Sequence, residues 1–414
     1  MINYEIITTK KWNFDNIIGK YKLHWRSKYL EVGTLQQTIA GIISNWQSYS
    51  RALACYNNTH VHYNGPKPHP PSLKRSGSKS EIVVVRNAIR IRENTFIITL
   101  SQNTSARFEN AMLKINYDQI WGKNYTSKSA LISEISNGLR QIRFKWNKMK
   151  SCWGLVIIYE QIAPDPILSN KNVMAIDIGL NNLCALTFRF GCKTFLINGR
   201  PLKSVNRFLN HKIDLEQSRS MKLIGSSQKY SDAASTKQIR ARLNSYISNY
   251  LHNVSKTCIE LAILEKCRII VIGNLKGIKK GHTNRSFVQI PLMRLVDMIK
   301  YKAEKNGLQT VLINEAYTSV SSSLDLEEIK YGYGRKSRRI HRGAFVSEKG
   351  IFINSDINGS LNILRLFLNH VYEKRLQSRR AGFSANLEGS IPELILFTRD
   401  KGYVVSPKMI NVFK

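Results

Sequence analysis

An apolar run near the middle of the chain, NVMAIDIG, carries an acidic residue, Asp177, at its end. A run of this kind predicts a strand covered on both faces, because neither face offers polar side chains to water. A carboxylate at the end of such a strand is costly unless it caps a turn or faces a cation. The sequence therefore predicts a buried sheet that carries an acid at one edge.

The segments around this run follow a definite order. Three stretches predict strands (VMAIDIG, LCALTFRF and CKTFLING), and a long helix follows through 239–261. RIIVIGN and TVLINE predict two further strands, separated by a helix that Pro291 opens and Gly307 closes. Three meandering strands followed by alternating helices and parallel strands are the order of an RNase H-like domain.

A second acid, Asp356, stands before an apolar helix in the sequence SDINGSLNI. Carboxylates brought together repel one another unless a cation lies between them, and Mg²⁺ needs only a few of them as ligands. Two such ions support phosphodiester hydrolysis. Each acid also has an ordinary explanation, because D-x-G occurs in actin-like ATPases and in turns, and Asp before a helix is a common N-cap. Their joint placement favours two magnesium ions held by Asp177 and Asp356.

The chain is strongly basic, with 63 Lys and Arg residues, 28 Asp and Glu residues and a net charge of +35 over 414 residues. Such a charge implies a polyanionic partner. Nucleic acid is favoured over a membrane surface, because no apolar run reaches the ~20 residues of a membrane span. The six cysteines form no C-x-x-C and predict core positions in a reducing compartment. Without a secretory h-region at the N-terminus, we expect a cytoplasmic, nucleoid-associated protein, or one in an equivalent genome-containing compartment.

The part of the chain before residue 172 predicts helix first and strands later. Residues 1–64 predict a helical segment with a capping box from Thr34 and Gln37, and with MINYEIITT as a candidate first strand of a barrel. A basic Pro-rich linker follows at 65–80, and residues 81–162 predict an antiparallel meander or small β-barrel. Its outward cations could lie along phosphates or simply face water; they are Arg86, Arg90, Arg92, Arg140, Arg143 and Lys145.

Several motifs in a fixed order resemble a known family. AIDIGLNNLCALT, VIGNLKGIKKG, FVQIPLMRLVDMIKYKAEKNG, EAYTS and SDINGSLNI are similar to motifs of the TnpB (OrfB) nucleases of insertion sequences, and the resemblance covers about 34–368. That family is related to Fanzor proteins and to compact type V CRISPR effectors. The resemblance implies an α+β multidomain fold with a helical recognition segment, a wedge-like β-barrel and a RuvC-type nuclease domain. It also implies a guide RNA from the element's own end, cleavage of matching double-stranded DNA, and catalytic metal ligands at Asp177 and Asp356.

The middle acid of that family is absent here. Gly273 in IIVIGNL stands where the pattern usually has a glutamate, and glycine has no ligand atom. Some branches of the family use a glutamate from the following strand instead, and Glu315 in INEAYTS stands at that place. A neighbouring strand lies only ~4.8 Å away, so Glu315 can complete the metal-binding and catalytic set with Asp177 and Asp356. The alternative is a polar residue that merely ends a strand.

The family's zinc knuckle is absent as well. The segment TSVSSSLDLEE contains no cysteine and none follows Cys267, so we expect no structural zinc. A basic insertion at 315–353 replaces the knuckle. We expect nucleic-acid contacts from cations in this insertion and after the RIIVIGN strand: Arg335, Lys336, Arg338, Arg339, Arg342, Lys276, Lys279 and Lys280.

Together these patterns predict a nuclease domain in two parts, 172–314 and 354–368, and a basic tail at 369–414. The hypothesis is a transposon-encoded, transposase-type protein that acts as an RNA-guided, Mg²⁺-dependent DNA endonuclease. Gly273 and the missing zinc cysteines leave an alternative, which is a nuclease-dead RNA-guided DNA-binding protein or a decayed transposon copy. Neither the oligomeric state nor the guide and target follow from the sequence.

Overall fold

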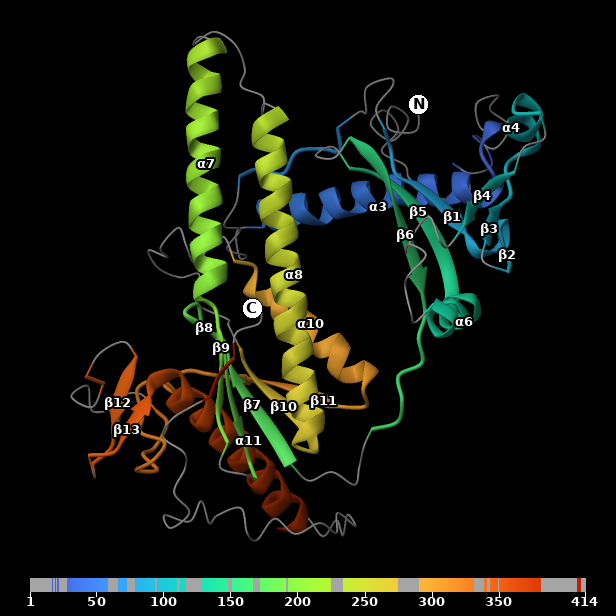
Figure 1. The fold of residues 1–414 in the computed structure, drawn as a ribbon. Helices are drawn as coiled ribbons and strands as arrows, with labels where there is room; N and C mark the ends of the chain where they lie inside the picture. Colours follow the sequence, from blue (N-terminus) through green and yellow to red (C-terminus); the bar gives the residue numbers. More distant parts are fainter. Residues whose placement is uncertain are drawn as a thin grey trace. The chain divides into compact units, whose positions relative to one another are not determined.

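The computed structural model divides the chain into two compact units, Met1–Ile162 and Ala163–Lys414, and each is described by itself (Figure 1). No helix in the described part of the chain is both long and apolar enough to cross a lipid bilayer. The candidate strand MINYEIITT lies outside the described residues, as does most of the C-terminal tail. The described residues are Ile17, Gly19, Tyr21, 28–58, 66–72, 79–93, 95–109, 112–116, 128–147, 151–166, 172–190, 193–224, 234–274, 290–330, 339–340, 343–348, 350–380 and 408–410.

A long helix, α3 (Val32–Asn57), is the main helix described in the first unit. Its N-cap is Glu31, whose carboxylate accepts hydrogen bonds at 2.9 Å from the backbone N–H groups of Gly33 and Thr34. The predicted capping box of Thr34 and Gln37 is therefore wrong, because the helix has already begun and Glu31 already satisfies its first N–H groups. The apolar face of the helix is formed by its buried residues, which are Leu35, Ile39, Ile43 and Trp46.

The strands of the first unit form two antiparallel sheets of three strands, in the orders β1–β5–β6 and β2–β3–β4. A 3₁₀ turn at Arg86–Ala88 separates β1 from β2 and sends the chain from one sheet into the other. The antiparallel pairing is confirmed, but the described strands do not close into the predicted barrel, because this turn interrupts the strand that would have joined both sheets. The strands are β1 (Ile82–Val85), β2 (Ile89–Arg92), β3 (Thr95–Ile98), β4 (Leu113–Asn116), β5 (Leu139–Asn147) and β6 (Cys152–Tyr159).

One apolar core serves both small sheets. Phe96 and Ile142, one from each sheet, are fully buried in it together with Ile135 of helix α6 (Lys128–Gly138). The sequence patterns do not predict α6, β4 or the short helix α4 (Gln102–Arg107), because each is brief and only weakly periodic. Arg143, one of the predicted outward cations, is half-buried and pairs with Glu81. The other predicted outward cations are exposed: Arg86, Arg90, Arg92, Arg140 and Lys145.

A mixed sheet of six strands, in the order β11–β10–β7–β8–β9–β14, forms the centre of the second unit (Figure 1). β7, β8 and β9 pair antiparallel as a meander, whereas β10 lies parallel to both β7 and β11. The predicted meander followed by parallel strands is therefore confirmed. The strands are β7 (Asn172–Asp177), β8 (Asn182–Phe188), β9 (Phe195–Asn198), β10 (Cys267–Asn274), β11 (Gln309–Asn314) and β14 (Lys408–Ile410). A separate hairpin pairs β12 (Ala344–Val346) with β13 (Phe352–Asn354).

Helices cover both faces of this sheet. Even-numbered residues of β7 and β10, such as Ile176 and Ile272, share a core with α8 and α10. Odd-numbered residues, such as Ala175 and Val271, pack against α11 on the other face. The sequence predicted one long helix between β9 and β10, whereas the chain forms two, α7 and α8. The helices are α7 (Arg200–Ile224), α8 (Ala234–Leu264), α10 (Leu292–Lys305) and α11 (Ser355–Arg380).

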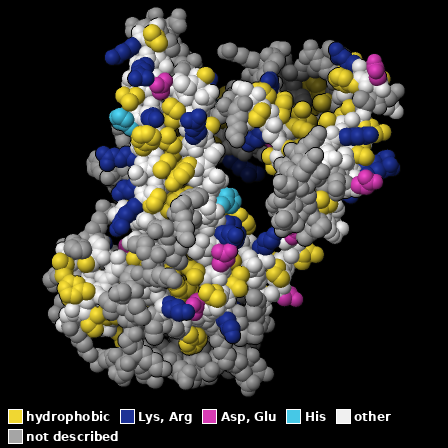
Figure 2. Space-filling model, in the orientation of Figure 1, with side chains coloured by type: hydrophobic (Ala, Val, Ile, Leu, Met, Phe, Trp, Pro, Cys, Tyr) yellow, Lys and Arg dark blue, Asp and Glu magenta, His cyan; other side chains and the backbone are white. Residues whose placement is uncertain are grey.

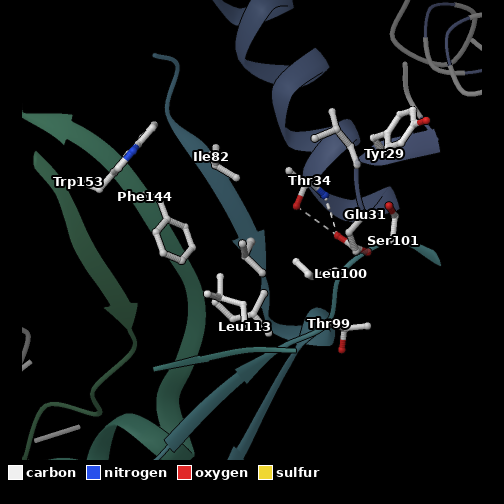
Figure 3. Close-up of a pocket in the computed structure, with 13 residues that line it drawn as sticks. Tyr29, Glu31, Thr34, Ile82, Thr99, Leu100, Ser101, Leu113, Phe144 and Trp153 are labelled. Carbon is white, nitrogen blue, oxygen red and sulfur yellow. Dashed lines mark hydrogen bonds between the residues drawn. The ribbon is translucent and has the colours of Figure 1, made fainter. Parts of the chain in front are cut away.

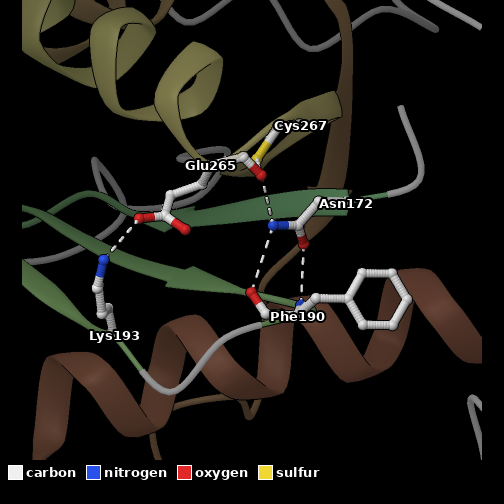
Figure 4. Close-up of polar contacts among 5 residues, drawn as sticks. All are labelled: Asn172, Phe190, Lys193, Glu265 and Cys267. Atoms are coloured by element: carbon white, nitrogen blue, oxygen red, sulfur yellow. Dashed lines mark hydrogen bonds and ion pairs between the residues drawn. The ribbon is translucent and has the colours of Figure 1, made fainter. Parts of the chain in front are cut away.

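A buried asparagine fixes the start of the central strand β7 (Figure 4). The side-chain amide of Asn172 donates to the carbonyl oxygen of Glu265 at 2.8 Å and to that of Phe190 at 3.3 Å. Its side-chain oxygen accepts the N–H groups of Phe190 and Val173, both at 2.9 Å. Asn172 thus joins the loop after β8 to the end of α8. The register of β7, and hence the position of Asp177, is fixed from its far end.

Candidate active site: two strand-end acids and an acid of helix α11

The face of the sheet that α11 covers carries both predicted strand-end acids. Asp177 ends β7 two residues after Ala175, and Glu315 follows β11 two residues after Ile313, and both of these apolar residues pack in the α11 core. Gly273 lies on β10, between the other two strands. Because side chains alternate along a strand and the three strands run parallel, these positions share one face and one edge of the sheet.

Helix α11 approaches Asp177 closely because Gly359 has no side chain. A Cβ atom at Gly359 would lie 2.5 Å from Oδ2 of Asp177. Gly359 is buried about one turn after Asp356, so the helix that carries the second acid also packs against the first. The glycine in SDINGSLNI is therefore required by the space that the Asp177 carboxylate occupies.

Glu315 fills the space that Gly273 leaves open. A Cβ atom at Gly273 would overlap Oε2 of Glu315 and lie 2.9 Å from Cδ1 of Ile363 on α11. The glutamate of the outer strand therefore reaches over the glycine of the middle strand. The position at which the resembling family usually has its middle acid is thus occupied by a carboxylate from the neighbouring strand.

Asp356 lies in the first turn of α11, but its carboxylate does not cap the helix. The backbone N–H of Asp356 donates to Oδ1 of Asn354 at 2.9 Å, so Asn354 supplies the capping oxygen. The Asp356 carboxylate instead accepts a hydrogen bond of 2.7 Å from Nδ2 of Asn182, at the start of β8. The N-cap alternative for Asp356 is therefore wrong, because the side chain of Asn354 caps the helix instead.

The acids influence one another electrostatically. Burial raises the pKa of Asp177 to about 8, and the nearby charges of Asp356 and Glu315 add to the rise, while the charge of Arg339 opposes it. Burial also raises the pKa of Glu315 to about 7. Carboxylates that are gathered and partly buried without a compensating cation show this behaviour, which is common at functional sites.

The donor atoms of this site fit a hard divalent cation. Asp177, Glu315 and Asp356 offer only oxygen ligands, and Oδ1 of Asn182 is a further buried oxygen with no hydrogen-bond partner. Within the described ranges, no group of three or more His, Cys, Asp or Glu side chains is drawn close enough together to hold an ion directly. Mg²⁺ commonly takes one or two carboxylates directly and keeps several waters, so the residues fit an ion held partly through water.

The predicted basic cluster is only partly described. Lys276, Lys279 and Lys280 lie outside the described residues, as do Arg335, Lys336, Arg338 and Arg342. Arg339 is exposed, and its charge is close enough to Asp177 to act on its pKa. One cation of the insertion is therefore near the acids, and the nucleic-acid role of the others stays a prediction.

Helix α7 adds a basic surface that the sequence patterns do not single out. It carries six Lys or Arg residues and two acids, and Figure 2 shows dark blue side chains gathered over α7 and α8. Its apolar residues Leu202 and Ile213 are buried, whereas five of its six cations are exposed and Lys203 is half-buried. The sequence of α7 has an amphipathic helical pattern, but asparagine and serine residues interrupt it. The cations of the helix are Arg200, Lys203, Arg207, Lys212, Arg219 and Lys222.

The first unit contains an open pocket of about 510 Å³ between the start of α3 and the β1–β5–β6 sheet (Figure 3). Ile82, Phe144 and Trp153 line it from the sheet, and Tyr29 and Glu31 line it near the helix. The lining is mainly apolar, and the Glu31 carboxylate caps α3. The pocket therefore presents no carboxylate free for chemistry, and the acids beneath α11 remain the candidate active site.

Fold and site together define a class of protein: a basic protein of two units whose mixed sheet brings strand-end carboxylates beneath a covering helix. Residues 293–363 match the family model described as Cas12f1-like, TNB domain. No sequence among the curated proteins matches the chain. A solved cryo-EM structure of a Cas12f1–sgRNA–target DNA complex is similar over 87% of this chain and 78% of that chain, with 13% identity and a TM-score of 0.52. A cryo-EM structure of a CRISPR–Cas12f ternary complex aligns with 87% of this chain and 76% of that chain, with 16% identity and a TM-score of 0.37.

The family model and the Cas12f1 structure agree with the resemblance to the TnpB and Cas12f group that the sequence motifs indicate. The family model supports it within residues 293–363, a range that includes both Glu315 and Asp356. The structural similarity to Cas12f1 shows that the fold is shared along most of the chain. The TnpB-like motifs and the observed strand order thus agree with an independent comparison of three-dimensional structures.

Proposed function

We propose that this protein is an RNA-guided DNA endonuclease whose RuvC-type site depends on Mg²⁺. The observation that carries the proposal is that Asp177 and Glu315 lie at one sheet edge and face α11, whose first turn carries Asp356, near enough for both other charges to act on Asp177. Two glycines, Gly273 and Gly359, leave room for the carboxylates of Glu315 and Asp177. The meander followed by parallel strands supports the RNase H-like domain class. The position of Asp177 and Glu315 on one face of this sheet, the face that α11 covers, supports a site at this edge.

Each residue has a distinct part in this proposal. Asp177 and Asp356 would hold the metal between the central strand and α11, and Glu315 would complete the set from the outer strand. When bound, the two Mg²⁺ ions would supply charge stabilisation for phosphodiester hydrolysis. Asn182 keeps the Asp356 carboxylate oriented through its 2.7 Å hydrogen bond. The sheet and α11 keep these groups in fixed positions.

The partners in this proposal are a guide RNA and a matching double-stranded DNA. The net charge of +35 and the cations of α7 support contacts with phosphates, which provide affinity without reading sequence. The solved Cas12f1 structure contains an sgRNA and target DNA, and its fold is similar. We infer an origin in a transposon, with guide RNA from the element's own end, and action in the compartment that holds the genome.

The direct test is cleavage of guide-matched duplex DNA by the full chain purified with the RNA that accompanies it. We expect cutting that requires Mg²⁺ and that is lost in the Asp177→Asn variant. Glu348→Gln, which changes an exposed glutamate of the same unit, is the matched control and should cut normally. No cutting by the wild-type protein with its own RNA at any Mg²⁺ concentration would contradict the nuclease.

A second candidate is an RNA-guided DNA-binding protein that does not cut. Gly273 favours it, because the usual middle acid is absent and Glu315 must act from another strand. In that case the protein–RNA complex would bind matched duplex equally well with Mg²⁺ and with EDTA, and Asp177→Asn would leave binding unchanged. Binding without cutting in the experiment above identifies this function.

A further inference from the structure

Helix α11 carries a second polar face beside the one that bears the acid. Asn358, Asn362 and Arg365 are spaced at i, i+4 and i+7, so they lie along one side of the helix. Asn358 and Asn362 are fully buried, and Arg365 is half-buried. Buried polar groups of this kind persist only when they are hydrogen-bonded. We call these three residues the α11 clamp.

The two asparagines of the α11 clamp bind the backbone of the segment that follows β11. The side-chain oxygen of Asn358 accepts the N–H of Ser323, and its amide donates to the carbonyl oxygen of Ser321, both at 2.8 Å. The amide of Asn362 donates to the carbonyl oxygens of Thr318 at 2.9 Å and of Ser321 at 2.8 Å. Four hydrogen bonds therefore join this segment to α11.

Arg365 completes the α11 clamp at the far end of the segment. Its Nη1 donates to the side-chain oxygen of Asn362 at 2.7 Å, and its Nη2 donates to the carbonyl oxygen of Glu327 at 3.0 Å. With this bond, both ends of the Asn362 amide group have partners. The clamp therefore holds 318–327 at several points through hydrogen bonds within the chain.

The segment held in this way starts beside the catalytic candidate Glu315. Both the backbone N–H and the hydroxyl of Thr318 donate to the carbonyl oxygen of Glu315, at 3.2 Å and 2.8 Å. A continuous path of hydrogen bonds thus runs from Asn362 through Thr318 to Glu315. The same helix holds Asp356 and packs against Asp177, so one helix fixes the positions of all three acids.

The clamped segment also stands where the resembling family has its zinc knuckle. It contains no cysteine, and no cysteine follows Cys267 in the chain, so its residues do not fit a thiolate zinc site. Three of its serines are instead buried: Ser321 is 0% exposed, Ser322 is 0% exposed and Ser323 is 5% exposed. The backbone groups of Ser321 and Ser323 are hydrogen-bonded to side chains of α11. A polar network occupies the place at which a metal would otherwise organise the loop.

We propose that the α11 clamp replaces the zinc knuckle as the element that positions Glu315 toward Asp177 and Asp356. This inference rests on the proposed nuclease function and deepens it. The clamp residues are positioning residues, because they act through the backbone of Glu315 and touch none of the reacting atoms. Loosening the clamp shifts the Glu315 carboxylate and weakens the binding of the divalent metal.

The test compares variants of α11 in the full chain with its RNA. Asn362→Leu removes the amide bonds with little change in volume, and Arg365→Met loosens only the end of the clamp. Asn369→Leu makes the same change as the first variant at an exposed position of the same helix and is the control. We measure the Mg²⁺ concentration for half-maximal cleavage, and the hydrogen-exchange protection of 318–327 in the presence of a zinc chelator.

We expect Asn362→Leu to need about tenfold more Mg²⁺ and Arg365→Met about threefold more, with no change in the control. Protection of 318–327 in the wild-type protein should survive the chelator. A lower melting temperature with an unchanged Mg²⁺ requirement would mean a merely structural role and would overturn the proposal, as would protection that disappears with the chelator. Should Asn362→Leu fail to fold, Arg365→Met decides the matter by the same criterion.

The outcome is separable from that of the proposed function. Should the wild-type protein cut nothing, the affinity of wild type and variants for Mn²⁺ is measured by calorimetry in place of cleavage. Weaker Mn²⁺ binding in Arg365→Met and Asn362→Leu than in Asn369→Leu supports the clamp even then. Equal affinities, or no Mn²⁺ binding by the wild-type protein, overturn it.

Discussion

The two units place their polar side chains on opposite principles. In the first unit, strands such as β2 alternate, with Ile89 buried and Arg90 exposed, so cations lie along one face of a half-covered sheet. In the second unit, every residue of β8 is buried and helices cover both faces. The polar residues of its strands stand at strand ends or next to them. A solvent-exposed sheet face therefore provides a diffuse charged surface. A sheet covered on both faces instead gathers its acids at one edge, where their charges influence one another.

The sharpest test of this contrast compares a glutamate at the covered edge with one on the open sheet. Glu315→Gln should reduce cleavage about 10²–10³-fold, because it removes one charge from the group of acids that the proposed chemistry needs. Glu160→Gln, in the first unit, removes a carboxylate that pairs with exposed Arg140 and should change cleavage little. Single-turnover cleavage rates measure both. Equal effects of the two variants would remove the distinction between the edge and the open face.

The covered edge should also respond to pH. The pKa of Asp177 is raised from 3.8 to about 8, so the folded protein holds this proton more tightly than the unfolded chain does. The contribution of this proton to the free energy of unfolding is fully present below pH 3.8 and is lost as the pH rises to about 8. Asp177→Asn removes this loss, so in EDTA its stability relative to wild type should increase between pH 4 and 8, by about 5 kcal/mol. Urea unfolding across this range measures it.

The outcome with metal provides the control for that experiment. Mg²⁺ should recover the stability of the wild-type protein at pH 8, because a bound cation replaces the proton, and should do less for Asp177→Asn. A wild-type stability that does not fall from pH 4 to pH 8 relative to the variant would show that the Asp177 carboxylate is solvated and uncrowded.

Matched valine truncations test the difference in covering directly. Val271 on β10 is 0% exposed, and Val156 on β6 is 42% exposed. Val271→Ala should cost about 2 kcal/mol of unfolding free energy, since it leaves a cavity between covered layers. Val156→Ala should stay within about 0.5 kcal/mol. Denaturant midpoints measure both, and a large effect at Val156 would indicate that the open face is covered in solution.

The smallest expected effect belongs to the cations of the open sheet. Arg90→Gln with Arg92→Gln should leave stability nearly unchanged, because both side chains are exposed. RNA affinity should fall a few-fold, and the log–log slope against salt should decrease by about 0.7 for each phosphate that the variant no longer neutralises. Filter binding at several salt concentrations measures this. An unchanged slope would mean that these cations face water only.

The charge patterns along the strands show what local sequence can and cannot predict about the site. Asp177 and Asp356 stand out from the sequence because each lies beside an apolar run. Asn182 does not, because its value lies in a hydrogen bond to Asp356, a residue far away in the chain. The capping prediction at Thr34 fails for a related reason, since Glu31 accepts the Thr34 N–H that Gln37 would accept in the predicted box. Periodicity predicts burial well, but it does not predict which polar groups become partners.

In the second unit, the sequence by itself determined the meander, the parallel strands that follow it and the acids at the strand ends. Period-2 and period-3.6 patterns allow this, because they show which side chains must be buried away from water. Tertiary structure alone decided that Glu315 lies over Gly273, that Gly359 makes room for Asp177, and that Asn362 holds the segment after Glu315. These contacts join residues that are distant in sequence, and their geometry arises only when α11 packs on the sheet. Hydrophobic patterning is local, whereas the approach of one backbone to another side chain is set by packing.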